Sequence, residues 1–236
     1  MQIIRSALFN IIFFSTITVI VILGYPLVFF NNPKYIFAFW HYLSIILKFI
    51  IAKIGGINDI VENEKNILQE PAIYAIRHES VWETLILINR FKEPIFLLKE
   101  ELLRIPIFGA LAKKAGAIAI DRNNGVKSLK EIVEQVKVSI SQRHPVIIFP
   151  EGTRMAFGEF SNLKRGIALI YRKTGCPVVP VIHNSGRFWP RRRFIKRSGT
   201  IVVKFLDPIM PGLTNDEFMN KLNCIFSTEI KKMETS

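Results

Sequence analysis

Two short patches of the sequence carry side chains that suit acid–base and anion-binding chemistry. His78 is followed five residues later by Glu83, in the stretch His-Glu-Ser-Val-Trp-Glu. A carboxylate that accepts one imidazole N–H fixes the tautomer, so that the other nitrogen can take a proton from a substrate hydroxyl. The second patch is Phe-Pro-Glu-Gly-Thr-Arg at 149–154, a turn with a glycine and an arginine whose guanidinium suits phosphate. The patches predict a base with its orienting acid and a nearby anion clamp.

The first patch works only if a particular local structure surrounds it. On one continuous helix, positions five residues apart diverge by about 140°, too far for His78 and Glu83 to pair well. We therefore expect His78 on a strand-to-helix turn and Glu83 in the first helical turn. Ser80 fits the N-cap position, with Glu83 three residues later. The same residues also suit a purely structural role, in which Glu83 only completes a capping box and His78 is a loop histidine.

Short apolar runs alternate with helical patterns along most of the chain. The runs at 72–76, 95–98, 117–120, 146–149, 178–182 and 200–205 predict strands. The patterns at 81–89, 101–114, 126–141 and 163–174 predict helices, and a Thr214–Glu217 capping box opens a last helix over 213–233. This alternation predicts an α/β fold, with a mostly parallel central sheet flanked by helices. Both patches follow strands, where the active sites of such sheets gather.

The N-terminal quarter of the chain is strongly apolar. Residues 7–30 form a run of 24 residues without a charge, and 36–52 is nearly as apolar. A helix of about 20 apolar residues can span a bilayer, so the first run qualifies, whereas the second favours an interfacial or re-entrant helix. The turn at 31–33 predicts a membrane-associated helical hairpin, and no small-x-small cleavage site follows the first run. We expect an uncleaved anchor at 1–57 and a globular domain at 58–236.

The formal net charge of +13 is unevenly distributed. Between Phe160 and Leu206 there are eleven Lys or Arg and no Asp or Glu, and six of these cations lie in 187–197, which we call the basic segment. Its aromatic residues could stack on nucleic-acid bases, or sit at the interface of an anionic membrane, or the segment could be a solvated loop. Beside an apolar hairpin we favour the membrane and expect no nucleic acid as partner.

The thiols and imidazoles do not show the spacing of a metal site. Cys176 and Cys224 are the only cysteines, and the histidines form no HExxH pattern. The sequence predicts no metal and no essential disulfide, which suits a domain that faces a reducing cytoplasm.

The two patches resemble signature motifs of the 1-acyl-glycerol-3-phosphate acyltransferase family, the lysophosphatidic acid acyltransferases. The match at 149–154 is complete over six residues, while Glu83 stands where the family usually has Asp. Two weaker blocks also resemble the family: Gly116 with Arg122, and 178–182. Taken alone, they could be a surface ion pair at a strand end and an edge strand. Lys164 and Gly166 fit a downstream Lys-x-Gly, and the resemblance covers about 58–212.

The resemblance implies a membrane-bound enzyme of phospholipid biosynthesis at the cytoplasmic face of the cell membrane. It would transfer a fatty acyl group from acyl-CoA or acyl carrier protein to the 2-hydroxyl of lysophosphatidic acid, giving phosphatidic acid without a further cofactor. His78 would be the base and Glu83 its partner. Glu151 would hold Arg154 in place or orient the dyad. The implied substrate-binding residues are Arg122, Glu151, Gly152, Thr153, Arg154 and Lys164.

Three alternatives differ from this interpretation. The acceptor could be another lyso-lipid, because one arginine does not identify the phosphorylated molecule. The chain could instead be a non-catalytic membrane protein that binds anionic lipid through the basic segment. A covalent mechanism through Ser80 is disfavoured, since the sequence has no Gly-x-Ser-x-Gly elbow.

Overall fold

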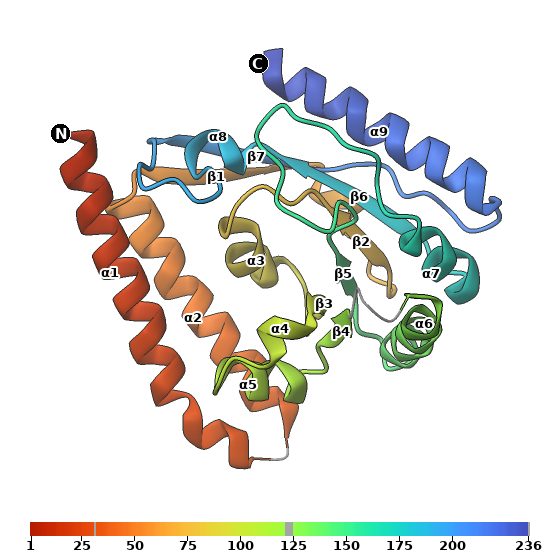
Figure 1. Ribbon diagram of the computed structural model, residues 1–236, viewed down its shortest axis with the longest axis horizontal. Coiled ribbons are helices and arrows are strands. Elements are labelled where there is room, and N and C mark those ends of the chain that lie inside the picture. Colours follow the sequence, from red (N-terminus) through yellow and green to blue (C-terminus); the bar gives the residue numbers. More distant parts are fainter. Residues whose placement is uncertain (31, 121–124, 236) are drawn as a thin grey trace.

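The computed structural model describes residues 1–30, 32–120 and 125–235, with side chains of 125–128 left aside. Within these residues the strands form one seven-stranded sheet in the order β1-β7-β6-β2-β5-β3-β4 (Figure 1). Every neighbouring pair is parallel except β6 with β7. The mostly parallel α/β sheet is therefore confirmed. The strands are β1 (Ile57–Glu62), β2 (Ile73–Ile76), β3 (Ile95–Lys99), β4 (Ile118–Ile120), β5 (Val146–Ile148), β6 (Val178–His183) and β7 (Gly199–Phe205).

Helices cover both faces of the sheet because its central strands are buried on both sides. Along β2, Ile73 and Ala75 belong to one hydrophobic cluster, and Tyr74 and Ile76 belong to the other. The first cluster includes α6 (Gly125–Ser141), α7 (Gly166–Thr174) and α9 (Asn215–Thr235). The second includes α1 (Gln2–Leu23), α2 (Pro33–Lys53) and α3 (Trp82–Ile86). Shorter elements are η1 (Tyr25–Phe29), η2 (Glu64–Asn66), η3 (Leu87–Arg90), α4 (Glu100–Leu103), α5 (Phe108–Lys114) and α8 (Ser185–Phe188).

The predicted hairpin is present as α1 and α2, which pack against each other (Figure 1). Both helices are long and apolar enough to cross a membrane. Leu47 and Ile51 of α2 are fully buried in the second cluster together with Ile57 of β1. The hairpin and the sheet thus share one hydrophobic cluster, and the domain boundary after residue 57 stays a prediction.

The elements differ from the sequence expectations in two places. No strand was predicted at 57–62, yet these residues form β1, which pairs in parallel with β7 at the edge of the sheet. Exposed positions alternate with more buried ones along β1, so it lacks the continuous apolar run of a buried strand. The strand predicted at 178–182 is confirmed, and its interior place between β7 and β2 excludes the alternative edge position.

The second difference concerns the helix predicted at 101–114, which is broken into α4 and α5. The break is a γ-turn in which the Phe108 N–H donates to the Pro106 carbonyl at 2.6 Å. Its central residue, Ile107, has φ 61° and ψ −61°, a conformation that a β-branched residue rarely adopts. Backbone packing here is close, since a Cβ on Gly109 would lie 2.2 Å from the Leu103 carbonyl oxygen. The break turns α5 and places Phe108 at its first position.

The basic segment is only partly a surface feature, which corrects the sequence interpretation. The Trp189 ring is buried edge-on against Phe9 and Phe13, with centroids 5.1 and 4.9 Å away. Lys196 is also buried, and its Nζ donates to the carbonyl groups of Arg193 and Phe194. The sequence of the segment alone does not show that α1 covers its tryptophan and its lysine.

Candidate active site

His78 and Glu83 pair in the geometry that their spacing requires. His78 follows β2, and Glu83 lies in the first turn of α3. The distance from His78 Nδ1 to Glu83 Oε1 is 2.8 Å. Because a carboxylate accepts and cannot donate, Nδ1 carries the proton and Nε2 is left with its lone pair. The His78 ring stacks on Phe149, with centroids 4.4 Å apart, and its side chain is 17% exposed.

Glu83 also serves as the helix cap, so the structural and the chemical roles coincide. Its Oε1 accepts from the backbone N–H groups of Glu79 and Ser80, each at 2.9 Å, and its Oε2 accepts from Ser80 Oγ at 2.9 Å. Ser80 Oγ in turn accepts from Trp82 N–H at 2.8 Å. The helix begins at Trp82, one residue later than an N-cap at Ser80 requires, yet the cap bonds are made. Glu83 is thereby held rigidly beneath the imidazole.

The surroundings of Glu83 keep it ionised. Burial alone would raise its pKa, but the neighbouring imidazoles of His183 and His78 and the hydrogen bonds together lower the pKa to about 2. A permanently charged carboxylate orients the ring and stabilises the imidazolium that forms when Nε2 takes a proton. The pair is therefore suited to general-base chemistry.

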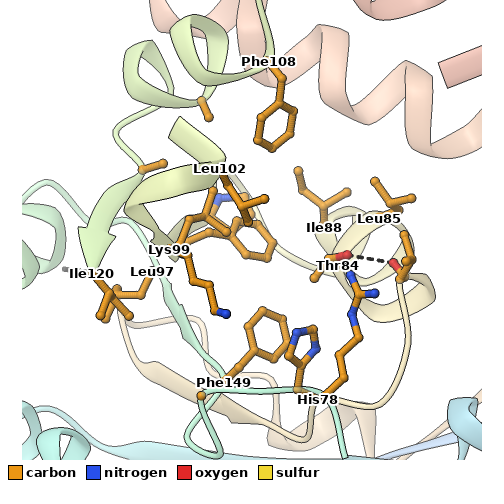
Figure 2. A pocket seen from close by; sticks show the side chains of 18 of the residues that line it. His78, Thr84, Leu85, Ile88, Leu97, Lys99, Leu102, Phe108, Ile120 and Phe149 are labelled. Atoms are coloured by element: carbon orange, nitrogen blue, oxygen red, sulfur yellow. Dashed lines mark hydrogen bonds between the residues drawn. The ribbon is translucent and has the colours of Figure 1, made fainter. Parts of the chain in front are cut away.

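His78 borders a largely apolar cavity of about 490 Å³ (Figure 2). The apolar wall comes from α2, α3, η3, β3, α4, α5, β4 and the residue after β5. Its members include Trp40, Leu85, Ile88, Phe96, Leu102, Phe108 and Ile120. Figure 2 shows His78 and Phe149 at one end of the cavity and Phe108 at the other. The cavity can bury an apolar chain while its polar end meets the imidazole.

Three of the residues predicted in the second patch line the same cavity. They are Gly152, Thr153 and Arg154, on the turn that follows β5. Gly152 has φ 68°, in the left-handed region that glycine adopts more readily than other residues. This conformation lets the backbone turn toward the cavity. Burial lowers the pKa of Arg154 from its ordinary value. A guanidinium at the cavity wall can bind the anionic end of a ligand whose hydroxyl faces His78.

Of the two roles expected for Glu151, its contacts fit support of the dyad rather than a hold on Arg154. It is buried and does not line the cavity. Its Oε1 accepts from the His78 backbone N–H at 3.4 Å and lies 3.7 Å from Arg77 Nη1, so it supports the His78 turn rather than holding Arg154. Burial raises the pKa of Glu151 to about 8.

One other predicted residue that the structure describes does not line the cavity. Lys164 is exposed and does not line it, although its backbone N–H donates to the Pro150 carbonyl at 2.8 Å. Arg122 lies outside the residues that the structure describes. The block at 178–182 forms buried strand β6 and likewise does not line the cavity.

A buried polar cluster behind the dyad escaped the sequence reasoning. Arg77 Nε donates to Glu79 Oε1 at 2.6 Å, and Arg77 Nη2 donates to the carbonyl groups of Ala156 and Glu159. Ser185 Oγ donates to Glu83 Oε2 at 3.1 Å. Arg77 adjoins His78 directly after β2, and a charged residue that extends a buried strand was a signal that could have been noticed. Ser185, the first residue of α8 and distant in the sequence, gave no such signal.

Further cations line the cavity beyond those predicted. They are Lys99 at the end of β3, and Arg191 and Arg192 of the basic segment. The sequence marked the segment as basic but could not show which of its cations faces the cavity. Among the described residues, no cluster of three or more His, Cys, Asp or Glu side chains could hold a metal ion.

Comparisons with known proteins agree with this geometry. A family model described as Acyltransferase matches residues 59–184. Over 150 residues the chain is 36% identical to a 1-acyl-sn-glycerol-3-phosphate acyltransferase of Pseudomonas aeruginosa, which covers 64% of this chain and 58% of that protein. It is 30% identical over 151 residues to the protein of the same name from Cocos nucifera, covering 63% and 49%. The chain thus spans about half the length of these relatives.

A match to a solved structure extends over the whole chain. The crystal structure of the 1-acyl-sn-glycerophosphate (LPA) acyltransferase PlsC from Thermotoga maritima superimposes with a TM-score of 0.82. It covers 100% of this chain and 99% of that one at 21% identity, which establishes a common fold. Since the family model covers more than half of the sequence and includes both motifs, the chain belongs to the acyltransferase family.

Proposed function

We propose that this chain acylates the 2-hydroxyl of 1-acyl-glycerol-3-phosphate to give phosphatidic acid. The observation that carries the proposal is that His78, oriented by Glu83, and Arg154 line the same largely apolar cavity. A lyso-lipid acceptor supplies a hydroxyl for His78 and a phosphate for Arg154, and the apolar cavity suits the acyl chain of the donor. The names of the relatives from Pseudomonas aeruginosa and Cocos nucifera support the same acceptor.

The proposed reaction needs no covalent enzyme intermediate. His78 Nε2 takes the proton of the acceptor hydroxyl while the oxygen attacks the thioester carbonyl carbon. A C–O ester bond forms, the C–S bond breaks, and the leaving thiolate takes the proton from the imidazolium. Glu83 keeps the ring oriented and its positive charge stabilised throughout. The acyl thioester of CoA or of acyl carrier protein is a co-substrate, and no further cofactor takes part.

The substrate-binding assignments belong to this proposal. Arg154, with Thr153 and the Gly152 turn, would hold the acceptor phosphate, since all three line the cavity. Arg122 and Lys164 remain predicted contributors. The hairpin of α1 and α2 would seat the cavity at a membrane, with the catalytic domain at the cytoplasmic face where acyl thioesters are made.

Product formation by the detergent-purified protein tests the proposal. With labelled oleoyl-CoA and lysophosphatidic acid, the wild type is expected to form phosphatidic acid, and His78→Ala is expected to lose about 10²-fold or more in kcat. His41→Ala, at an exposed position of α2, is the matched control and should keep full activity. Equal rates for the two variants would refute His78 as base. If the wild type prefers another acceptor in a panel of lyso-lipids, the proposed acceptor is wrong but the proposed acyl transfer stands.

A further inference from the structure

The basic segment lies between α1 and the cavity, and α1 holds its backbone. Arg5 Nη2 donates to the Lys196 carbonyl at 3.2 Å, and the Lys196 N–H donates to Ser6 Oγ at 3.0 Å. Asn10 Nδ2 donates to the Phe194 carbonyl at 3.1 Å. Side chains from two successive turns of α1 therefore fix the outer side of the segment.

Packing fixes the same segment from within. Trp189 is buried among α1 aromatic rings, and Lys196 Nζ lies 5.6 Å from the centroid of the Trp189 ring while it caps two carbonyl groups of the segment. A loop held by so many contacts loses little entropy on binding a ligand, so its side chains are preorganised.

The other side of the segment reaches the anion-binding turn. Arg191 Nη1 donates to Thr153 Oγ1 and to the Arg154 carbonyl, each at 3.2 Å. Arg191 and Arg192 line the cavity beside Arg154. Arg192 adopts φ 56°, which is uncommon for residues other than glycine. The backbone therefore turns at this residue, where both arginines line the cavity.

The charges of these arginines are not balanced within the protein. No ion pair to Arg154, Arg191 or Arg192 occurs in the described part of the chain. Burial lowers the pKa of Arg154, Glu83 opposes this shift, and the two neighbouring arginines lower the pKa further. Three like charges kept together at a cavity wall gain most from an anion that carries two negative charges, such as a phosphate monoester.

We propose that Arg191 and Arg192 complete, with Arg154, a single site for a phosphate monoester, and that α1 holds this site in place through the basic segment. The identity of the ligand as a lysophosphatidic acid rests on the proposed function. The donor also carries phosphates, so the experiment must distinguish the two sources. The segment is then a wall of the binding site rather than a membrane-docking patch.

A binding assay tests the site without requiring turnover. Lysophosphatidic acid and monoacylglycerol, which lacks the phosphate, are compared in detergent micelles by equilibrium dialysis on the His78→Ala background. Arg191→Gln and Arg192→Gln are each expected to weaken lysophosphatidic acid binding about tenfold, as the loss of a hydrogen bond to a charged group does. Binding of monoacylglycerol should stay unchanged.

Arg193→Gln and Arg197→Gln are matched controls, since they remove the same charge from exposed positions of the segment that do not line the cavity. They should bind lysophosphatidic acid as the parent does. Equal weakening by all four variants would overturn the proposal in favour of a general electrostatic patch, and so would no weakening by any.

Kinetics on the otherwise wild-type chain separates the phosphate of the acceptor from that of the donor. Arg192→Gln is expected to raise KM for lysophosphatidic acid about tenfold and to leave KM for acyl-CoA unchanged. A rise in KM for acyl-CoA alone would assign the site to the donor and overturn the acceptor site. If the wild type proves inactive, the proposed function fails, while the dialysis result still decides the anion site.

The role of α1 has its own test at a distance from the cavity. Asn10→Ala removes a contact to the segment without touching the turn at 152–154, and it should raise KM for lysophosphatidic acid severalfold with kcat retained. Ser15→Ala, on the exposed face of α1, is the control. If Asn10→Ala and Ser15→Ala give the same KM, then α1 does not position the site.

Discussion

At the scale of single residues, one carboxylate performs two tasks that are usually divided. Glu83 accepts the N–H groups that open α3, and it also orients His78. A capping interaction stabilises a helix by about 1 kcal/mol, and here the same bonds fix the position of the acid. Any substitution at Glu83 should therefore alter both folding and catalysis.

We expect Glu83→Gln to lower kcat by about 10²–10⁴-fold and also to lower the unfolding temperature. The amide of glutamine places an NH₂ donor against the N–H and O–H donors of Ser80 and Ser185, which then lose their acceptor. It also lacks the negative charge that stabilises the imidazolium. Rates and thermal melts measure both effects. Glu217→Gln is the control, because Glu217 closes a capping box with Thr214 at the start of α9. A Glu83→Gln enzyme with unchanged kcat would show that Glu83 is only a cap.

Glu151 provides a prediction about pH. Its pKa is about 8 in the folded chain and near 4.5 when exposed, so the folded state binds the proton more tightly. The stability it contributes is present below about pH 4.5 and is lost as pH rises through 8, by up to about 1 kcal/mol per unit. Glu151→Gln should remove this decline in denaturant titrations, whereas exposed Glu131→Gln should keep it. An identical pH dependence in both variants would contradict a protonated Glu151.

Sequence reasoning identified site residues whose partners lie a few positions away in the chain. It missed residues whose partners are distant in the sequence. His78 and Glu83 are five positions apart, and their pairing follows from local geometry. Ser185 contacts Glu83 from 102 positions away, and Arg191 contacts Thr153 from 38. Such contacts depend on sheet order, which spacing along one sequence does not determine. Lys164 shows the opposite error: it matches a motif position in the sequence, yet it does not line the cavity.

At the scale of elements, the break between α4 and α5 shapes the far end of the cavity. The γ-turn at Ile107 places Phe108 opposite His78 (Figure 2). The prediction of one helix at 101–114 followed the apolar pattern and overlooked Pro106, a helix-breaking residue that stands next to Ile107. The buried strands were predicted well because an interior strand is a short apolar run, whereas the edge strand β1 was missed because half of it faces solvent.

Phe108→Ala should shift the preferred acyl donor toward longer chains. Truncating the ring lengthens the cavity at the end away from His78, while the dyad stays unaltered. The shift is measured from rates with a series of acyl-CoA chain lengths. The ratio of the rate with long donors to the rate with short donors is compared between the wild type and the variant, so a general loss of activity cancels. An unchanged ratio with lower activity at every length would mean that Phe108 only supports α5.

At the scale of the whole molecule, the hairpin is part of the folded core as well as an apolar pair of helices. Leu43, Leu47, Ile50 and Ile51 of α2 are buried in the cluster beneath the sheet. Burial of four such side chains is worth about 6–12 kcal/mol, which is comparable to the 5–15 kcal/mol that separates folded from unfolded states of a typical domain.

We therefore expect a chain that starts at Gly55 to fail to fold cooperatively. Loss of α2 exposes the apolar face of the sheet, and loss of α1 removes the contacts of the basic segment. Size-exclusion chromatography and thermal melts in detergent, with the full chain alongside, measure the outcome. A monomeric species with the melting temperature of the full chain would show that residues 55–236 are an independent domain.

The contacts between α1 and the basic segment also order events in time during synthesis. Arg5 and Asn10 are made first, yet their partners at Lys196 and Phe194 follow 191 and 184 residues later. While the ribosome elongates the chain, α1 can pack on α2 but lacks its partners in the basic segment. A nascent chain that already contains His78 and Arg154 still lacks one wall of its cavity. The two sides of the anion site can meet only after residues 194–196 have been made, so the site is completed long after both signature motifs have been synthesised.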